Sequence, residues 1–173
     1  MVTRLHIGSG QSDNPDIYDW TRLDIDPNAR DVSIVHDIRK PLPLPDTSVE
    51  EIYASHVLEH IPYRKVIEVL TDWHRVLTPG GKLSVFVPDI WQLARNFRDN
   101  PTGSNYLVLH FRTFAAVGQT SEIEAANSHH LISFDCRWFR YYLPRLGFSD
   151  IEFVDRGYNN IEVGVVAYRQ RSG

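Results

Sequence analysis

The sequence has one cysteine, Cys136, and only three lysines among its 18 basic residues. A single cysteine excludes a disulfide framework and a cysteine-based zinc finger, and a lone thiol is typical of a reducing compartment. No apolar run approaches the roughly 20 residues of a membrane span, and the first residues lack the apolar core of a secretory signal. Internal repeats and low-complexity tracts are also missing. We therefore expect a soluble, cytoplasmic protein.

The net charge and the chain length exclude further classes of protein. The net charge is −4, so no overall basic field would attract nucleic acid. The chain has 173 residues, 42% of them hydrophobic, which suffices for one domain with a core and excludes a disordered chain or a coiled coil. We expect a single domain over residues 1–173, as a monomer or small homo-oligomer, with neither nucleic acid nor a membrane as partner.

Strand and helix patterns follow one another along the chain and predict an α/β fold with a mostly parallel sheet. Expected strands cover residues 4–7, 21–24, 32–37, 49–55, 82–87, 150–154 and 161–168. Expected helices cover residues 62–77, which Pro79-Gly80-Gly81 should end, residues 90–98, and the stretch from Asp135 to Gly147. The last two strands could pair as a hairpin. The first two connections are too short for ordinary helical crossovers, so loops must make them.

Polar residues and glycines follow the first three expected strands. Gly8 and Gly10 follow the first strand, Asp24 ends the second and Asp37 ends the third. In open α/β sheets, ligands bind beyond the carboxyl ends of the strands. Glycine lets the backbone approach a ligand closely, one carboxylate can accept both hydroxyls of a ribose, and another can accept from the amine of a purine. The pattern indicates an adenosine site.

An ordered set of motifs covers nearly the whole chain: LHIGSG at 5–10, LDID at 23–26, HDI at 36–38, PLPD at 43–46, SVEEIY at 48–53, VLEH at 57–60, LTPGGK at 77–82 and LGF at 146–148. In this set the chain resembles class I S-adenosylmethionine-dependent methyltransferases, above all reduced, methyltransferase type 11-like members with a very short first half. The resemblance implies a Rossmann-like methyltransferase fold with a C-terminal antiparallel hairpin strand and shortened first crossovers. It also implies S-adenosyl-L-methionine as cofactor.

The resemblance assigns cofactor-binding roles to a set of strand-end residues. Gly8 and Gly10 would lie beside the methionine part of the cofactor, and Asp24 would bind the ribose. The full implied set is Gly8, Ser9, Gly10, Asp24, Asp37, Ile38, Ser55 and His56, in which Asp37 and the Ile38 N–H lie on the adenine side and Ser55 and His56 face the methyl donor. The sequence departs from the family at His6, where an acid is usual, and in the helix after the glycines, which is shortened or missing.

Several of these residues have a second reading. Asp26 is the alternative ribose acid, although its position before a proline favours a simple turn. Asp89 and Gln92 have capping-box spacing for the helix of residues 90–98, so Asp89 fits either a cap or a substrate role. His6 lies within a strand and is expected to fill the core or the wall of the cleft.

The run HVLEH at residues 56–60 matches the inverted zinc-protease pattern, H-x-x-E-H. It lies at a strand-to-helix junction of a methyltransferase-like sequence, and no third ligand is placed for it in the sequence. We therefore expect no metal there, with Glu59 and His60 orienting the loop by hydrogen bonds.

Residues 100–134 form a connection that is long for a compact domain, and such loops often cover or bind ligands. We expect an acceptor-side lid, in which Tyr106, Phe111 and Phe114 would wall the acceptor. A histidine near neutral pKa could take the acceptor's proton, and the candidate catalytic residues are His56, His129 and His130.

The expected activity is methyl transfer to an oxygen, nitrogen or carbon nucleophile, with a small molecule or saccharide precursor as the preferred acceptor. The alternative is a non-catalytic interaction protein or partner subunit on a degenerate methyltransferase fold, which the missing first crossover motivates. A nicotinamide-dependent oxidoreductase ranks last, because G-x-G-x-x-G opening a long helix is missing.

Overall fold

The computed structural model describes residues 3–10, 19–99, 130–155 and 162–171. Within them, one sheet has the strand order β3-β2-β1-β4-β5-β7-β6. The strands are β1 Arg4–Ile7, β2 Thr21–Asp24, β3 Ile34–Val35, β4 Val49–Ser55, β5 Leu77–Pro88, β6 Phe148–Val154 and β7 Glu162–Arg169. The helices are α1 Tyr63–Val76, α2 Ile90–Asp99 and α5 Cys136–Tyr142, with short 3₁₀ turns η2 Leu58–His60 and η3 Pro144–Leu146.

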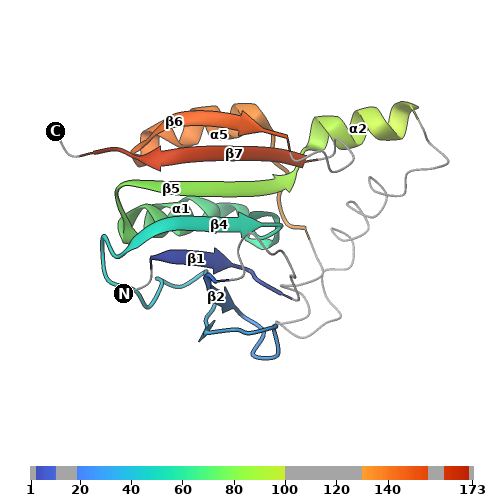
Figure 1. Ribbon diagram of the computed structural model, residues 1–173. Coiled ribbons are helices and arrows are strands. Elements are labelled where there is room, and N and C mark those ends of the chain that lie inside the picture. The colour runs from blue at the N-terminus through green and yellow to red at the C-terminus, as the bar shows by residue number, and fades with distance from the viewer. Residues whose placement is uncertain (1–2, 11–18, 100–129, 156–161, 172–173) are drawn as a thin grey trace.

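The sheet is parallel from β3 through β5, and β7 then runs antiparallel to both β5 and β6. The expected α/β fold and its C-terminal hairpin are thus confirmed. The connection from β2 to β3, residues 25–33, contains no helix although the two strands are parallel, as the short spacing predicted. The carboxyl ends of β1, β4 and β5 lie at the same edge of the sheet (Figure 1).

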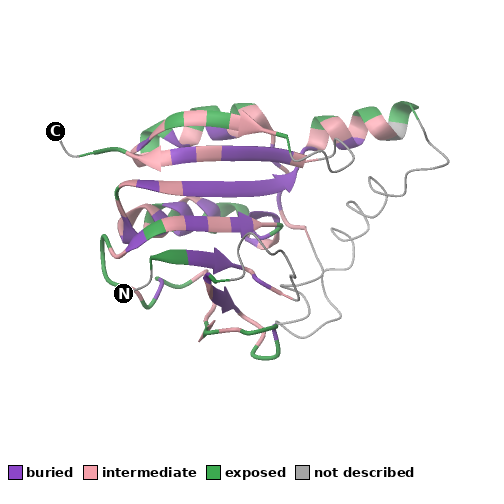
Figure 2. Ribbon diagram, viewed as in Figure 1, coloured by how far each residue is buried: buried purple, intermediate pink, exposed green. Residues whose placement is uncertain are grey.

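Helix α1 forms because its apolar residues recur at helical spacing and cover one stripe. Trp73 is fully buried, and the other buried residues of the stripe are Val66, Val69, Leu70 and Val76. Helices α1 and α5 lie on the same face of the sheet (Figure 1). Buried residues follow one another along the second half of β5 and most of the first half of β7 (Figure 2), and with β1 and β4 they form the core that holds the strand ends in place.

The expected helix 62–77 agrees with α1 to within one residue at each end, but the bounds of two expected strands are wrong. Strand β5 begins at Leu77 and not at residue 82, because Leu77 already pairs with Val49 in the sheet before the Pro-Gly-Gly run. Residues 78–81 then bulge out before the pairing resumes at Lys82. Strand β3 is also shorter than residues 32–37, since it is the edge strand and Val35 is exposed.

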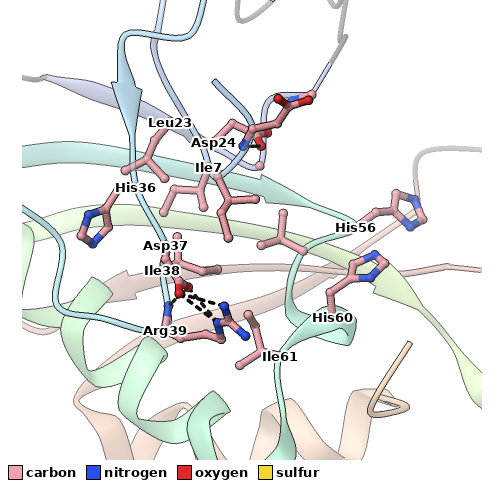
Figure 3. A pocket seen from close by; sticks show the side chains of 15 residues that line it. Ile7, Leu23, Asp24, His36, Asp37, Ile38, Arg39, His56, His60 and Ile61 are labelled. Carbon is pink, nitrogen blue, oxygen red and sulfur yellow. Dashed lines mark hydrogen bonds and ion pairs between the residues drawn. The ribbon is translucent and has the colours of Figure 1, made fainter. Parts of the chain in front are cut away.

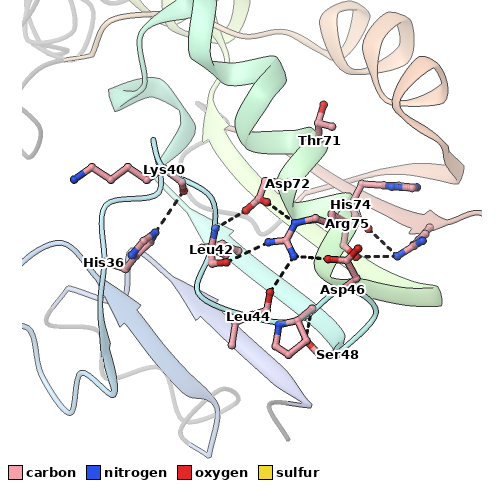
Figure 4. A network of polar contacts seen from close by, with 12 residues as sticks. His36, Lys40, Leu42, Leu44, Asp46, Ser48, Thr71, Asp72, His74 and Arg75 are labelled. Atoms are coloured by element: carbon pink, nitrogen blue, oxygen red, sulfur yellow. Dashed lines mark hydrogen bonds and ion pairs between the residues drawn. The ribbon is translucent and has the colours of Figure 1, made fainter.

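The proline-rich segment 41–46 is held against α1 by one arginine (Figure 4). The Arg75 guanidinium donates to the backbone oxygens of Leu42 at 3.1 Å and Leu44 at 2.9 Å, and to the carboxylates of Asp46 and Asp72 at 2.6 and 2.7 Å. Asp72 in turn accepts from the Leu42 N–H at 2.7 Å. This segment has no strand partners, so side chains on α1 satisfy its backbone groups instead.

Asp135 caps α5 by accepting from the Trp138 N–H at 2.8 Å, and Gly147 at φ 88° ends η3, as the sequence predicted for both ends of this stretch. Asp89 likewise accepts from the N–H groups of Trp91 and Gln92 at 2.8 and 3.1 Å. The capping reading of Asp89 is therefore confirmed. Among the described residues, no helix is both long enough and apolar enough to cross a membrane.

Candidate functional site

A cavity of about 280 Å³ opens beyond the carboxyl ends of β1, β2 and β4. Asp37 and Arg39 lie at one side of it and His56 and His60 at the other (Figure 3). Of the eight residues expected to bind the cofactor, six line it: Gly8, Gly10, Asp24, Asp37, Ile38 and His56. Ser9 and Ser55 do not line the cavity, and the Ser9 side chain is buried beneath it.

The loop after β1 requires glycine for steric reasons. Gly8 has φ +67°, and a Cβ there would lie 2.3 Å from Cγ2 of Val57, far inside van der Waals contact. The Gly8 N–H donates to the Leu23 oxygen at 2.8 Å, which fixes the loop on β2. Gly10 also has positive φ, +49°, but a Cβ there would meet open space. Only Gly8 is therefore needed for both conformation and room.

Asp24 is 8% exposed, and its carboxylate joins the two loops that border the cavity. One oxygen accepts from the Gly10 N–H at 2.8 Å and the other from the Asp26 N–H at 2.9 Å. Asp26 itself accepts from the Asn28 N–H at 2.8 Å, which is the turn predicted as its alternative reading. A carboxylate has about four acceptor positions, so Asp24 retains acceptor capacity toward the cavity.

Asp37 is held in a fork that the sequence analysis missed. The Arg39 guanidinium donates to both oxygens of the Asp37 carboxylate, from Nε to Oδ1 and from Nη2 to Oδ2, each at 2.9 Å. These hydrogen bonds lower the pKa of Asp37, so the carboxylate is ionised at the edge of the cavity. An acid and an arginine two residues apart were the available signal, and only the turn after β3 brings them face to face.

His56 occupies the left-handed region at φ 55°, where β4 leaves the sheet, and its N–H donates to the Phe86 oxygen at 2.8 Å. Its ring joins two carboxylates: Nδ1 lies 3.1 Å from Glu59 and Nε2 lies 2.5 Å from Glu162. The Glu59 bond first, and then Glu162, raise the pKa of His56 against the opposing effect of burial. Glu162 was not a candidate in the sequence analysis, because it lies 106 residues away on β7.

His6 is 2% exposed and packs its ring edge-on against Tyr53 at 5.3 Å, so it fills the core as expected. Burial, helped by the nearby Arg22 charge and opposed by Asp24, lowers the pKa of His6 to about 4. The ring is therefore neutral at physiological pH.

The expected acceptor-side segment is only partly described. Tyr106, Phe111, Phe114 and His129 lie outside the described residues. His130 is described, and its ring lies edge-on to His60 at 4.9 Å between centroids. The following N–H groups of Leu131 and Ile132 donate to the Glu59 backbone oxygen at 2.6 and 3.3 Å. The end of the segment thus contacts the turn η2 beside the cavity.

Residues 5–85, which include β1, β4 and most of β5, match the family model described as a methyltransferase domain. Over these residues the chain is similar to a methyltransferase domain. The sheet order with an antiparallel β7, and the loops that line the cavity after β1 and β2, agree with the resemblance seen in the motifs. No functionally curated relative matches the sequence.

Solved methyltransferase structures share the fold of this chain at low sequence identity. A SAM-dependent methyltransferase from Archaeoglobus fulgidus is 14% identical with a TM-score of 0.66, over 96% of this chain and 86% of that chain. A SAM-dependent methyltransferase of Thermotoga maritima, a possible histamine N-methyltransferase, is 14% identical with a TM-score of 0.64, over 97% and 82%. The CurJ carbon methyltransferase is 16% identical with a TM-score of 0.63, over 98% of this chain and 48% of that chain, so the chain spans about half its length.

Proposed function

We propose that this methyltransferase domain binds S-adenosyl-L-methionine in the cavity beyond β1, β2 and β4 and transfers its methyl group to an acceptor. The observation that carries the proposal is the arrangement of Gly8, Asp24 and Asp37 around one cavity of about 280 Å³. The family match and the solved methyltransferases of the same fold support it. The solved structures include a possible histamine N-methyltransferase and a carbon methyltransferase, so they support the reaction class and not one acceptor.

The residues present fit this cofactor. Gly8 lets the loop after β1 pack against Val57 in the cavity wall, and the space beside Gly10 is open. In the proposal Asp24 accepts from the ribose hydroxyls, Asp37 accepts from the adenine amine, and the backbone of Ile38 lies beside the ring. Ile7, Leu23, Val57 and Ile61 add apolar walls to the same cavity. A few directional polar groups in an apolar cavity are typical of a small-molecule site.

Bound S-adenosyl-L-methionine supplies an electrophilic methyl group, which the acceptor attacks in line as the bond to sulfur breaks and its electron pair stays on sulfur. The residues of this chain contribute positioning and exclusion of water. Of the candidate bases, His56 already has a carboxylate at each ring nitrogen, so it best serves to hold the loop after β4. We assign any release of the acceptor's proton to the side of the cavity that His60 lines, next to His130.

The acceptor in this proposal is a small molecule or a saccharide precursor. The net charge of −4 supports it, because no overall positive field would draw a nucleic acid to the cavity. The described end of the expected lid supports it as well, since residues 130–132 contact η2 beside the cavity.

Isothermal titration of the full chain with S-adenosylmethionine and S-adenosylhomocysteine tests the proposal. We expect one site per chain for both ligands. Turnover is then measured by release of S-adenosylhomocysteine with panels of hydroxylated, amino and sugar acceptors. Failure of both ligands to bind at millimolar concentration would overturn the proposal and favour the non-catalytic interaction protein.

A further inference from the structure

A cluster of three side chains lies next to the proposed cofactor cavity. Glu59 and His60 come from η2, and His130 comes from a distant part of the chain. One carboxylate oxygen of Glu59 and one ring nitrogen of each histidine all lie within 4.8 Å of one another. Ligand atoms that are each about 2 Å from one zinc ion lie about 3–4 Å apart, so small side-chain movements would let the three atoms share an ion.

The burial of Glu59 is a second, independent observation. Its side chain is 0% exposed, and Oε1 lies 3.1 Å from Nδ1 of His56. The other oxygen, Oε2, is buried and has no hydrogen-bond partner among the described residues. A buried carboxylate oxygen is costly to leave unpaired, whereas a cation beside it would satisfy it.

We propose that Glu59, His60 and His130 bind a divalent transition-metal cation, with Zn²⁺ as the expected ion. Two imidazoles and one carboxylate form the ligand set of a catalytic zinc site, which keeps its fourth position open for water or substrate. Mg²⁺ and Ca²⁺ prefer all-oxygen sites, so the two histidines disfavour them. From the sequence we expected no metal, because the H-x-x-E-H run had no third ligand placed for it. In the folded chain His130 provides the third ligand.

The groups around the cluster hold its ligands in place. The His56 ring contacts the Glu59 carboxylate through Nδ1 and the Glu162 carboxylate through Nε2. The Glu59 backbone oxygen accepts from the Leu131 N–H at 2.6 Å, which ties the segment carrying His130 to the turn carrying the other two ligands. Groups that hydrogen-bond to metal ligands orient those ligands, and loss of such a group usually lowers the metal affinity about 10–100-fold.

The position of the cluster suggests the class of acceptor, and this step rests on the proposed function. His60 belongs to the cluster and also lines the cofactor cavity, on the same side as His56 (Figure 3). An acceptor oxygen at the open metal position would therefore lie beside the methyl donor. A bound cation lowers the pKa of such a hydroxyl, so its proton passes to solvent, its oxygen forms the bond to the methyl carbon, and the sulfur keeps the electrons of the broken bond. The acceptor class is thus an alcohol or phenol.

The test uses the full chain without an affinity tag, stripped with chelator and titrated with ZnCl₂ by calorimetry, with metal content measured by mass spectrometry. We expect one zinc per chain. His60→Ala, His130→Ala and Glu59→Gln should each weaken zinc binding at least about tenfold. His36→Gln is the matched control, because His36 also lines the cavity but lies outside the cluster. Circular dichroism and thermal unfolding confirm that each variant is folded.

A second readout replaces zinc with Co²⁺, whose visible absorption reports tetrahedral coordination by the protein. Intense bands in the parent chain that are lost in His130→Ala would support the site. Zinc binding that is absent, or equal in all variants, would overturn it. Titration with S-adenosylhomocysteine is run in parallel. If the chain binds zinc but not S-adenosylhomocysteine, the proposed function alone is overturned. If it binds S-adenosylhomocysteine but not zinc, the metal site alone is overturned.

Discussion

The Asp24 carboxylate accepts from the Gly10 N–H at 2.8 Å and so joins the end of β2 to the loop after β1. A second bond, from the Asp26 N–H at 2.9 Å, uses its other oxygen. The residue proposed to bind the ribose therefore also fixes the shape of the cavity that receives it. A substitution that removes the charge of Asp24 but keeps the side-chain shape should therefore affect ligand binding differently from one that removes both.

We expect Asp24→Ala to weaken S-adenosylhomocysteine binding by about 2–3 kcal/mol, because hydrogen bonds to a charged group and two backbone partners are lost together. Asp24→Asn keeps the shape and one acceptor oxygen, and should lose about half as much. Calorimetry measures both. Unchanged affinity in Asp24→Ala would move the ribose role to Asp26 or remove the site, and Asp26→Ala separates these two outcomes.

Asp37 should read the adenine amine. S-inosylhomocysteine carries an oxygen in place of that amine, so the parent chain should bind it about tenfold more weakly than S-adenosylhomocysteine, the effect of one lost hydrogen bond of about 1.4 kcal/mol. In Asp37→Ala the two ligands should bind alike. Arg39→Gln tests the fork: it should reduce affinity for both ligands while preserving the preference. A preference that survives in Asp37→Ala would contradict the role.

Alanine substitutions at Gly8 and Gly10 form a matched pair that separates the effect of positive φ from the effect of a steric clash. Gly8→Ala combines positive φ with a clash at 2.3 Å against Val57, and we expect it to lower the free energy of unfolding by about 3 kcal/mol and to block S-adenosylhomocysteine binding. Gly10→Ala has only the positive φ, and should cost about 1 kcal/mol. Urea denaturation measures both. Equal stability of the two variants would show that the space above Gly8 does not matter.

His6 should make stability fall in mild acid. The folded chain holds the pKa of His6 at about 4, below the ordinary value of 6.5, so the unfolded chain binds more protons between these values. The stability is fully present above pH 6.5 and is lost as the pH falls to 4, by about 3 kcal/mol.

Urea denaturation from pH 7 to pH 4 follows this loss, and His6→Leu is the comparison, because leucine fills a similar volume without a titrating group. The variant should show a shallower dependence on pH over this range. The same dependence in both chains would assign the effect to carboxylates instead.

The sequence predicted those parts of the fold that depend on local pattern. Strands β1, β2 and β4 appear at the expected residues, and α1 follows the expected apolar periodicity, because burial of one face selects both kinds of element from their side-chain spacing. The start of β5 was placed too late. Pro79-Gly80-Gly81 is a strong local signal for a break, but Leu77 already pairs with Val49 before it.

The sequence by itself also determined which residues gather at the cavity edge, since the carboxyl ends of parallel strands must share one side of a sheet. Gly8, Asp24 and Asp37 line the cavity for that reason. Only the tertiary structure decided which partners those residues meet. The Arg39 fork on Asp37, the Glu162 contact of His56 and the approach of His130 to Glu59 depend on how loops turn and on which strands become neighbours. Contacts between residues far apart in the chain leave no periodic signal in the sequence, so folding alone brings them together.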